Sequence, residues 1–213
     1  MPETRRPNPP ARASDDAGVR AGKAELRAAI RGARRSPEPA GARRARTQQA
    51  LTLSLPHEVI ALYGSVRNEP DTWSLIDALA GAGRTLLLPV LGRREDGTVR
   101  RHPDWAPFAG RDALRAGYAG IAEPTTPPLG ADALAEASLI WCAALAATPA
   151  GDRLGTGGGW YDRALAHAAS QAVRGVLLRD DEVLDRLPVE SFDRRIDLIV
   201  TPVRTLRTVR APE

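Results

Sequence analysis

The sequence has little cysteine and no long hydrophobic run. Its 213 residues include a single cysteine, Cys142, which excludes an intrachain disulfide and any zinc or iron–sulfur site built from several thiols. No unbroken apolar segment approaches the roughly 20 residues of a membrane-spanning helix, and the N-terminal residues lack the apolar core of a signal peptide. We therefore expect a soluble cytoplasmic protein without a membrane partner, in which Cys142 is buried and inert.

Histidine and lysine are also scarce. His57, His102 and His167 are scattered without the spacing of metal ligands, so we expect neither a catalytic nor a metal-binding histidine. The chain has 29 arginines and only one lysine, Lys23. A compact ammonium at a single position suits a phosphate oxygen better than a planar guanidinium does, although chance explains one lysine equally well.

The positive charge is unevenly distributed. The net charge is +4, but residues 1–50 carry 12 basic and 5 acidic side chains, so that the remainder has a net charge of −3. A basic N-terminal segment can contact a polyanion, yet a solvated segment is the simpler interpretation. We expect no nucleic-acid partner, and we expect a monomer.

Apolar runs typical of buried strands alternate with helical stretches along the chain. Such alternation predicts an α/β fold, in which a mostly parallel sheet of one domain is flanked by helices on both faces in a Rossmann-like arrangement. The predicted strands are residues 59–63, 85–90, 138–145, 173–178 and 196–201. Helices or helical turns are predicted from Lys23, after Pro37, and at residues 72–82, 131–137, 160–170 and 180–186.

The domain limits follow from composition. Residues 1–19 are rich in Pro, Arg, Ser and Asp, so we expect a disordered arm, followed by a domain at 20–205 and a tail at 206–213. Within the domain, residues 92–102 predict a hairpin insertion around Asp96 and Gly97. Residues 103–128 form a long irregular segment, and a loop of that length usually builds part of a site.

The most informative segment is GDRLGTGGGWYDR, residues 151–163. It follows a predicted strand and precedes a predicted helix, and its glycines allow backbone N–H groups to approach a phosphate. The spacing matches neither a Walker A loop nor a dinucleotide fingerprint. Because arginines flank the loop at both ends, we favour a phosphate site over a merely structural turn.

Carboxylates and aromatic side chains surround this loop in the sequence. Asp162 is either a helix cap or a Mg²⁺ ligand, and Asp193 is a candidate second ligand with an equally plausible structural role. Trp160 and Tyr161 suit stacking on a flat heterocycle, although a core role for one of them is as plausible.

A second group of candidates follows the first predicted strand. Gly64 and Glu69 are placed there to line the same crevice, and a carboxylate at Glu69 suits the adjacent N–H donors of an amino-pyrimidinone ring. A solvated loop is the alternative interpretation.

These residues resemble the family of 5-formyltetrahydrofolate cyclo-ligases, also called 5,10-methenyltetrahydrofolate synthetases. The resemblance runs from Lys23 to about Thr201 and rests on six motifs in the right order, of which the glycine loop with its Y-D-R extension is the most specific. The other motifs are K-A-E-L-R near the start, Y-x5-E-x-D-T after the first strand, L-L-P-V, G-I-x-E-P, and L-P-x-E-x-x-D-x-x-I-D near the end.

The resemblance implies cyclisation of 5-formyltetrahydrofolate to 5,10-methenyltetrahydrofolate with ATP and Mg²⁺, through a phosphorylated formyl oxygen. It implies that Lys23 and Arg153 are catalytic, that Asp162 and Asp193 bind the metal, and that Gly64, Glu69, Trp160 and Tyr161 lie at the reduced folate. The ATP-binding residues that it implies are Lys23, Arg27, Arg153, Gly155, Thr156, Gly157, Gly158, Gly159 and Tyr161.

The chain departs from the family pattern at three places. Ala147 and Thr148 replace a frequent Phe and Asp ahead of the glycine loop, residues 99–102 lack a frequent methionine, and Trp160 replaces a common Tyr with another flat ring. Two alternatives therefore stay open: a nucleotide- or RNA-binding protein of the same fold without folate turnover, and the same ATP chemistry on another formyl or amide substrate.

Overall fold

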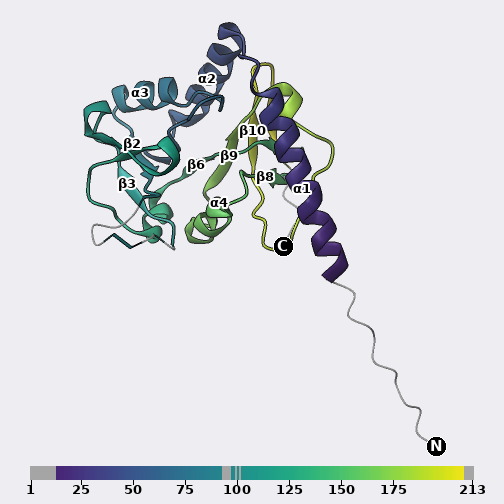
Figure 1. The fold of residues 1–213 in the computed structure, drawn as a ribbon. Coiled ribbons are helices and arrows are strands. Elements are labelled where there is room, and N and C mark those ends of the chain that lie inside the picture. The colour runs from purple at the N-terminus through teal and green to yellow at the C-terminus, as the bar shows by residue number, and fades with distance from the viewer. Residues whose placement is uncertain (1–12, 93–96, 99, 101, 209–213) are drawn as a thin grey trace, which may run out of the picture.

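The computed structural model describes residues 13–92, 97–98, 100 and 102–208. Its centre is a seven-stranded sheet in the order β11-β10-β9-β6-β1-β2-β3 (Figure 1). The five inner strands are parallel, and the edge strands β11 and β3 are antiparallel to their neighbours. The strands of this sheet are β1 (Val59–Ala61), β2 (Thr85–Pro89), β3 (Trp105–Pro107), β6 (Leu139–Cys142), β9 (Val173–Leu177), β10 (Leu198–Val200) and β11 (Thr205–Arg207).

Two small hairpins lie outside the main sheet. One pairs β4 (Leu114–Ala116) with β5 (Ala122–Pro124), and the other pairs β7 (Ala146–Ala147) with β8 (Arg153–Leu154). The second hairpin leads directly into the glycine loop.

The helices cover both faces of the sheet, as predicted. They are α1 (Ala13–Ala33), α2 (Ala40–Ser54), α3 (Trp73–Gly81) and α4 (Trp160–Ala164), with 3₁₀ turns at Arg111–Ala113, Tyr118–Gly120, Ala131–Glu136, Leu165–His167 and Asp180–Glu182. On one face, α2 and α3 contribute Ala50 and Leu75 to a core that contains Trp141. On the other face, α4 contributes Tyr161 and Ala164 to a second core (Figure 1).

The predicted strands are found because both of their faces are buried, which requires nearly continuous apolar side chains. All four residues of β6 are buried, as are four of the five in β2. The edge strands β3 and β11 were not predicted, because they are short and carry Pro107 or the polar Thr205 and Arg207.

The structure corrects three boundaries. Helix α1 begins at Ala13, so residues 13–19 are helical and do not belong to a disordered arm. The predicted helix at 160–170 is a five-residue α4 followed by a 3₁₀ turn, and β11 extends the sheet into the predicted tail. The predicted hairpin at 92–102 lies mostly outside the described residues, as do residues 1–12.

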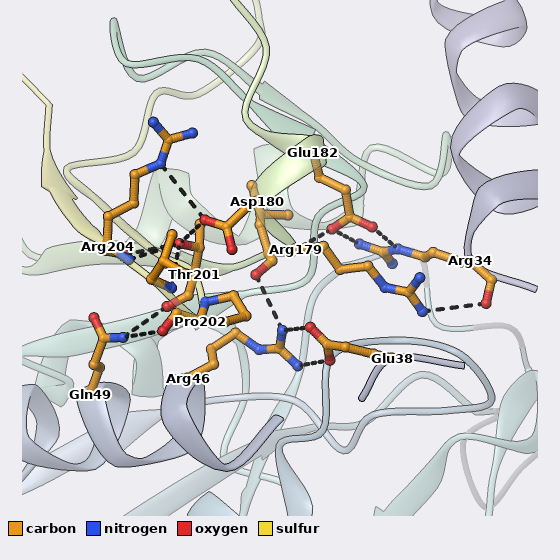
Figure 2. Close-up of polar contacts among 12 residues, drawn as sticks. Arg34, Glu38, Arg46, Gln49, Arg179, Asp180, Glu182, Thr201, Pro202 and Arg204 are labelled. Carbon is orange, nitrogen blue, oxygen red and sulfur yellow. Dashed lines mark hydrogen bonds and ion pairs between the residues drawn. The ribbon is translucent and has the colours of Figure 1, made fainter. Parts of the chain in front are cut away.

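Helix α1 is docked to the body of the protein by apolar and polar contacts. Leu26 and Ile30 pack against a small core around Leu145 and Leu154, next to the glycine loop. At the C-terminal end of α1, the buried Arg34 forms an ion pair with the buried Glu182 (Figure 2). Because α1 carries Lys23 and Arg27, these contacts fix where the basic side chains lie.

Helix α2 is held to the same end of the sheet. Arg46 pairs with Glu38 and donates to the carbonyl oxygen of Leu178, and Gln49 donates to the carbonyl oxygens of Thr201 and Pro202 (Figure 2). These contacts lie just beyond the carboxyl ends of β9 and β10, so both N-terminal helices are anchored beside the ends of the parallel strands.

Candidate active site

A cavity of about 800 Å³ lies at the carboxyl ends of the parallel strands. Strands β1 and β6 are neighbours, and the chain leaves β1 toward β2 but leaves β6 toward β9. Such a reversal of direction opens a crevice where ligands bind in open α/β sheets. Tyr63 and Gly64 after β1, and Ala143 after β6, line this cavity.

Every site residue predicted from the sequence lines this one cavity. Segments as distant as α1, the turn after β1, the glycine loop and the stretch before β10 meet here. The predicted residues are Lys23, Arg27, Gly64, Glu69, Arg153, Gly155, Thr156, Gly157, Gly158, Gly159, Trp160, Tyr161, Asp162 and Asp193.

The glycine loop, residues 155–159, turns its carbonyl oxygens toward arginines. Arg27 Nε donates to the carbonyl oxygen of Gly155 at 2.9 Å, and Arg31 Nη2 donates to that of Thr156 at 2.8 Å. Gly157 and Gly159 have φ values of +114° and +61°, which disfavour other residues. The conformation of the loop is therefore fixed by hydrogen bonds to its carbonyl oxygens.

The N–H side of the same loop is free to bind an anion. In the described part of the chain, no acceptor is found for the backbone N–H groups of residues 155–159. Because α4 has only five residues, these N–H groups, rather than a helix dipole, are the attraction for a phosphate.

Arg153 contributes a buried guanidinium beside the loop. Its Nη2 donates to Oδ1 of Asp162 at 2.5 Å, and its side chain is 2 % exposed. Its Nε has no hydrogen-bond partner among the described residues. A buried cation in the wall of a cavity is suited to attract a phosphate.

Asp162 is not a helix cap. Its carboxylate accepts from Arg153 and, at 3.2 Å, from the backbone N–H of Arg194, and it makes no capping bond to α4. Of the two roles that the sequence left open for Asp162, the capping role is wrong.

Lys23 contacts carboxylates in this structure. Its ammonium lies 2.8 Å from Oε2 of Glu190 and 2.5 Å from Oδ2 of Asp193, and Glu190 also accepts from Arg20 at 3.2 Å. The hydrogen bond from Lys23 lowers the pKa of Glu190 from its ordinary value. Lys23 and Asp193 therefore lie close enough to act on one ligand.

The turn after β1 places Glu69 in the cavity wall. Oε2 of Glu69 accepts the backbone N–H of Val66 at 3.0 Å. Burial raises the pKa of Glu69, while the Val66 N–H and the charge of Arg34 act against that rise. A half-buried carboxylate with remaining acceptor capacity can receive N–H donors of a ring.

A glycine is required at position 64 by side-chain packing, and not by the close approach of a ligand. A Cβ atom at this position would lie 2.4 Å from the indole of Trp73, so the close packing of Trp73 excludes any side chain there. The sequence could not distinguish this packing constraint from a ligand contact.

Of Trp160 and Tyr161, one belongs to the core and the other is more exposed to the cavity. Tyr161 belongs to the core, and burial raises the pKa of its hydroxyl well above the ordinary value. Trp160 is half-buried and stacks edge-on against Trp105 and Tyr161, at centroid distances of 5.1 and 4.9 Å. Both rings nevertheless line the cavity.

Several lining residues were missed by the sequence reasoning. Arg20 and Arg31 continue the helical spacing of Lys23 and Arg27 on one face of α1, which is a signal that could have found them. The long segment 103–128, expected to build part of a site, contributes Ala119 and Ile121. The missed residues are Arg20, Arg31, Tyr63, Val66, Arg67, Pro89, Leu91, Ala119, Ile121, Ala143, Leu154, Glu190 and Phe192.

Other polar candidates lie away from the cavity. None of the three histidines lines it. Thr148, which stands where many family members have Asp, is buried, accepts the N–H of Asp152 at 3.1 Å and does not line the cavity. Cys142 is buried, which raises its pKa to about 12, as expected for an inert thiol.

The acidic side chains of the cavity are suited to bind a metal ion that is also bound by a phosphate. Among the described residues, no group of three or more His, Cys, Asp or Glu forms a metal cage. Mg²⁺ typically binds to one or two carboxylates together with phosphate oxygens and water. Asp162 and Asp193 supply that number of carboxylates in one cavity.

Comparisons with known proteins agree with the resemblance seen in the sequence. Curated relatives include a 5-formyltetrahydrofolate cyclo-ligase of Mycolicibacterium smegmatis, 35 % identical over 74 % of this chain and 80 % of the relative. Another, from Escherichia coli K12, is 30 % identical over 73 % of this chain and 87 % of the relative.

Solved structures share the fold. The NMR structure of Aquifex aeolicus 5,10-methenyltetrahydrofolate synthetase matches with a TM-score of 0.70 at 23 % identity, covering 90 % of this chain and 96 % of that one. A 5,10-methenyltetrahydrofolate synthetase from Mycoplasma pneumoniae matches with a TM-score of 0.64 at 18 % identity, covering 84 % of this chain and 98 % of that one.

No described helix is long and apolar enough to cross a membrane. Since residues 15–202 match the family model, the chain belongs to the 5-formyltetrahydrofolate cyclo-ligase family.

Proposed function

We propose that this protein is a 5-formyltetrahydrofolate cyclo-ligase that uses ATP and Mg²⁺ to form 5,10-methenyltetrahydrofolate, ADP and phosphate. The observation that carries the proposal is one cavity that combines free N–H groups of a glycine loop, the buried cations Lys23 and Arg153, and the carboxylate Glu69. Family membership supplies the substrate.

The reaction demands charge neutralisation more than acid–base catalysis. ATP supplies a phosphoryl group to the formyl oxygen of the substrate, which turns a poor leaving group into phosphate. The neighbouring nitrogen then attacks the formyl carbon and loses its proton as phosphate departs. Such a reaction depends on positioning and on electrostatic stabilisation of the phosphoryl oxygens.

The basic side chains perform that neutralisation in our proposal. Six cationic and four acidic side chains line the cavity in its described part, an excess of two positive charges that favours a polyanion. Arg153 supplies its buried positive charge to bound phosphate, while Arg27 and Arg31 keep the glycine loop in place through its carbonyls. Lys23 takes a phosphate oxygen.

Binding of ATP with its metal would exchange partners within the site. Lys23 and Arg153 now neutralise Asp193 and Asp162. A phosphate needs the two cations, and Mg²⁺ needs the two carboxylates. We therefore assign Asp162 and Asp193 to the metal, each released from its ion pair when phosphate takes the cation.

The folate occupies the remaining wall. Glu69 accepts the N–H donors of the pterin, Trp160 and Tyr161 lie beside its rings, and Gly64 lines the same wall while leaving room for Trp73 behind it. The apolar side chains of Pro89, Leu91 and Ile121 exclude water from the reacting atoms, which strengthens the electrostatic contacts there.

The test is a rise in near-ultraviolet absorbance, where the methenyl product absorbs, with purified protein, 5-formyltetrahydrofolate, ATP and Mg²⁺. We expect a rise that requires both ATP and Mg²⁺ and that is lost in Arg153→Met. A protein that binds ATP but gives no rise would overturn the proposal, and folate-free nucleotide binding or another formyl substrate would replace it.

A further inference from the structure

Arg67 differs from the other cationic side chains that line the cavity. The others each hold a carboxylate or a backbone carbonyl, whereas Arg67 is exposed and has no hydrogen-bond or ion-pair partner in the described part of the chain. A guanidinium has five N–H donors. Arg67 is therefore a cation at the cavity whose donors are all available to a ligand.

The backbone of Arg67 is in an unfavourable conformation. Its φ is +52°, and the one other described non-glycine residue with positive φ, Ala119 at +55°, lines the same cavity. A side chain in the left-handed region is strained, and such strain gathers at ligand-binding sites. Two strained positions on one cavity indicate that its wall is shaped for a ligand.

The turn that carries Arg67 also carries Glu69. The N–H of Glu69 donates to the carbonyl of Val66 at 3.1 Å, and the N–H of Val66 donates back to the carboxylate of Glu69 at 3.0 Å. Arg67 is thus fixed relative to Glu69, on the folate wall of the site. The cations assigned to phosphate come instead from α1 and the strand before the glycine loop.

We propose that Arg67 binds a carboxylate of the glutamate tail of the folate substrate. This inference rests on the proposed function. The substrate joins its pterin through an aminobenzoyl ring to a glutamate, so a molecule whose pterin meets Glu69 carries carboxylates at its far end. A guanidinium pairs with a carboxylate through two parallel hydrogen bonds. The exposure of Arg67 suits the solvated end of the substrate.

Arg67→Asn is the decisive variant, because Asn tolerates positive φ and removes the guanidinium without adding strain. We expect the KM for 5-formyltetrahydrofolate to rise about 5- to 10-fold, as for a partly exposed charged hydrogen bond. The KM for 5-formyltetrahydropteroate, which lacks the glutamate, and the KM for ATP stay unchanged. The melting temperature does not fall.

Arg43→Gln is the matched control, because it removes the same charge from an exposed position on α2 outside the cavity. We expect all three KM values to stay unchanged in this variant. The inference is overturned if Arg67→Asn raises the KM for the pteroate substrate equally, raises the KM for ATP, or changes nothing. If the wild type neither binds nor converts the folate, the proposed function fails as well. If the wild type converts the folate and Arg67→Asn leaves its KM unchanged, the glutamate-tail site is refuted while the proposed function stands.

Discussion

The ammonium of Lys23 and the carboxylate of Asp193, 170 residues apart in the sequence, lie 2.5 Å from each other in the wall of the cavity beside the glycine loop. Lys23 is the only lysine of the chain and is almost fully buried. The pair joins α1 to the segment before β10, so it fastens the helix that carries the basic side chains of the site.

Lys23→Ala is expected to impair both ATP use and stability. The loss of a charged contact to phosphate should raise the KM for ATP about 10- to 100-fold. The melting temperature should fall, because Asp193 then loses its counterion and Glu190 keeps only the exposed Arg20. Initial rates at varied ATP and thermal melting of the same preparations measure the two effects.

The double variant Lys23→Ala with Asp193→Asn, compared with Asp193→Asn alone, separates these effects. Removing the unpaired carboxylate should restore most of the melting temperature while the KM for ATP stays high. If the KM for ATP recovers together with stability, Lys23 acts only as a structural ion-pair partner.

Asp162→Asn and Asp193→Asn should each raise the Mg²⁺ concentration needed for half-maximal activity by about 10-fold or more, because an amide oxygen is a weaker ligand for this cation than a carboxylate. Titration of Mg²⁺ at saturating ATP measures the shift. Asp185→Asn, an exposed position that does not line the cavity, is the control. An unchanged Mg²⁺ dependence in both cavity variants would remove these residues from the metal site.

The inner sheet and the glycine loop at the centre of the site were predictable from local sequence signals. Strands such as β6 and β2 are buried on both faces and therefore read as continuous apolar runs. The glycine loop required no tertiary information, because four of its five residues are glycine and arginines flank it. The ends of neighbouring parallel strands meet by geometry, so Glu69 and Asp162 were correctly expected in one crevice.

The pairing of charges was not predictable. Whether Asp162 meets a helix terminus or Arg153, and whether Lys23 meets Asp193, depends on how distant segments pack. The clash that makes Gly64 obligatory likewise comes from Trp73, whose orientation no local pattern fixes. Short edge strands such as β3 carry too few residues for a periodic signal.

Glu69→Gln should stabilise the protein while weakening folate binding. Burial raises the pKa of Glu69 above its ordinary value of 4.5, so ionisation costs folding free energy, and this penalty grows as the pH rises from 4.5 through the pKa of the folded state. We expect a higher melting temperature than wild type at pH 7 and none of that gain near pH 4, where the carboxyl is protonated in both states.

The folate side of this prediction is measured at pH 7 by the KM for 5-formyltetrahydrofolate, which should rise about 10-fold because a neutral amide accepts the pterin donors less strongly. Glu58→Gln, at an exposed position outside the cavity, should change neither quantity. A Glu69→Gln protein that is less stable at pH 7 but binds folate normally would show that the carboxylate serves the turn and not the substrate.

Glu182→Ala should be far more destabilising than the loss of an exposed carboxylate. Both oxygens of Glu182 accept from the buried Arg34, at 2.6 and 2.9 Å (Figure 2), so truncation leaves an uncompensated buried guanidinium and costs about 3–5 kcal/mol. Asp77→Ala removes the partner of Arg111 in an exposed pair and should cost less than about 1 kcal/mol. Denaturant unfolding measures both values.

Because Arg34 lies at the end of the helix that presents Lys23, the Glu182 variant should also bind ATP less tightly. Replacing Arg34 and Glu182 together with methionine should recover stability. Equal losses in the two carboxylate variants would mean that the buried pair does not anchor α1.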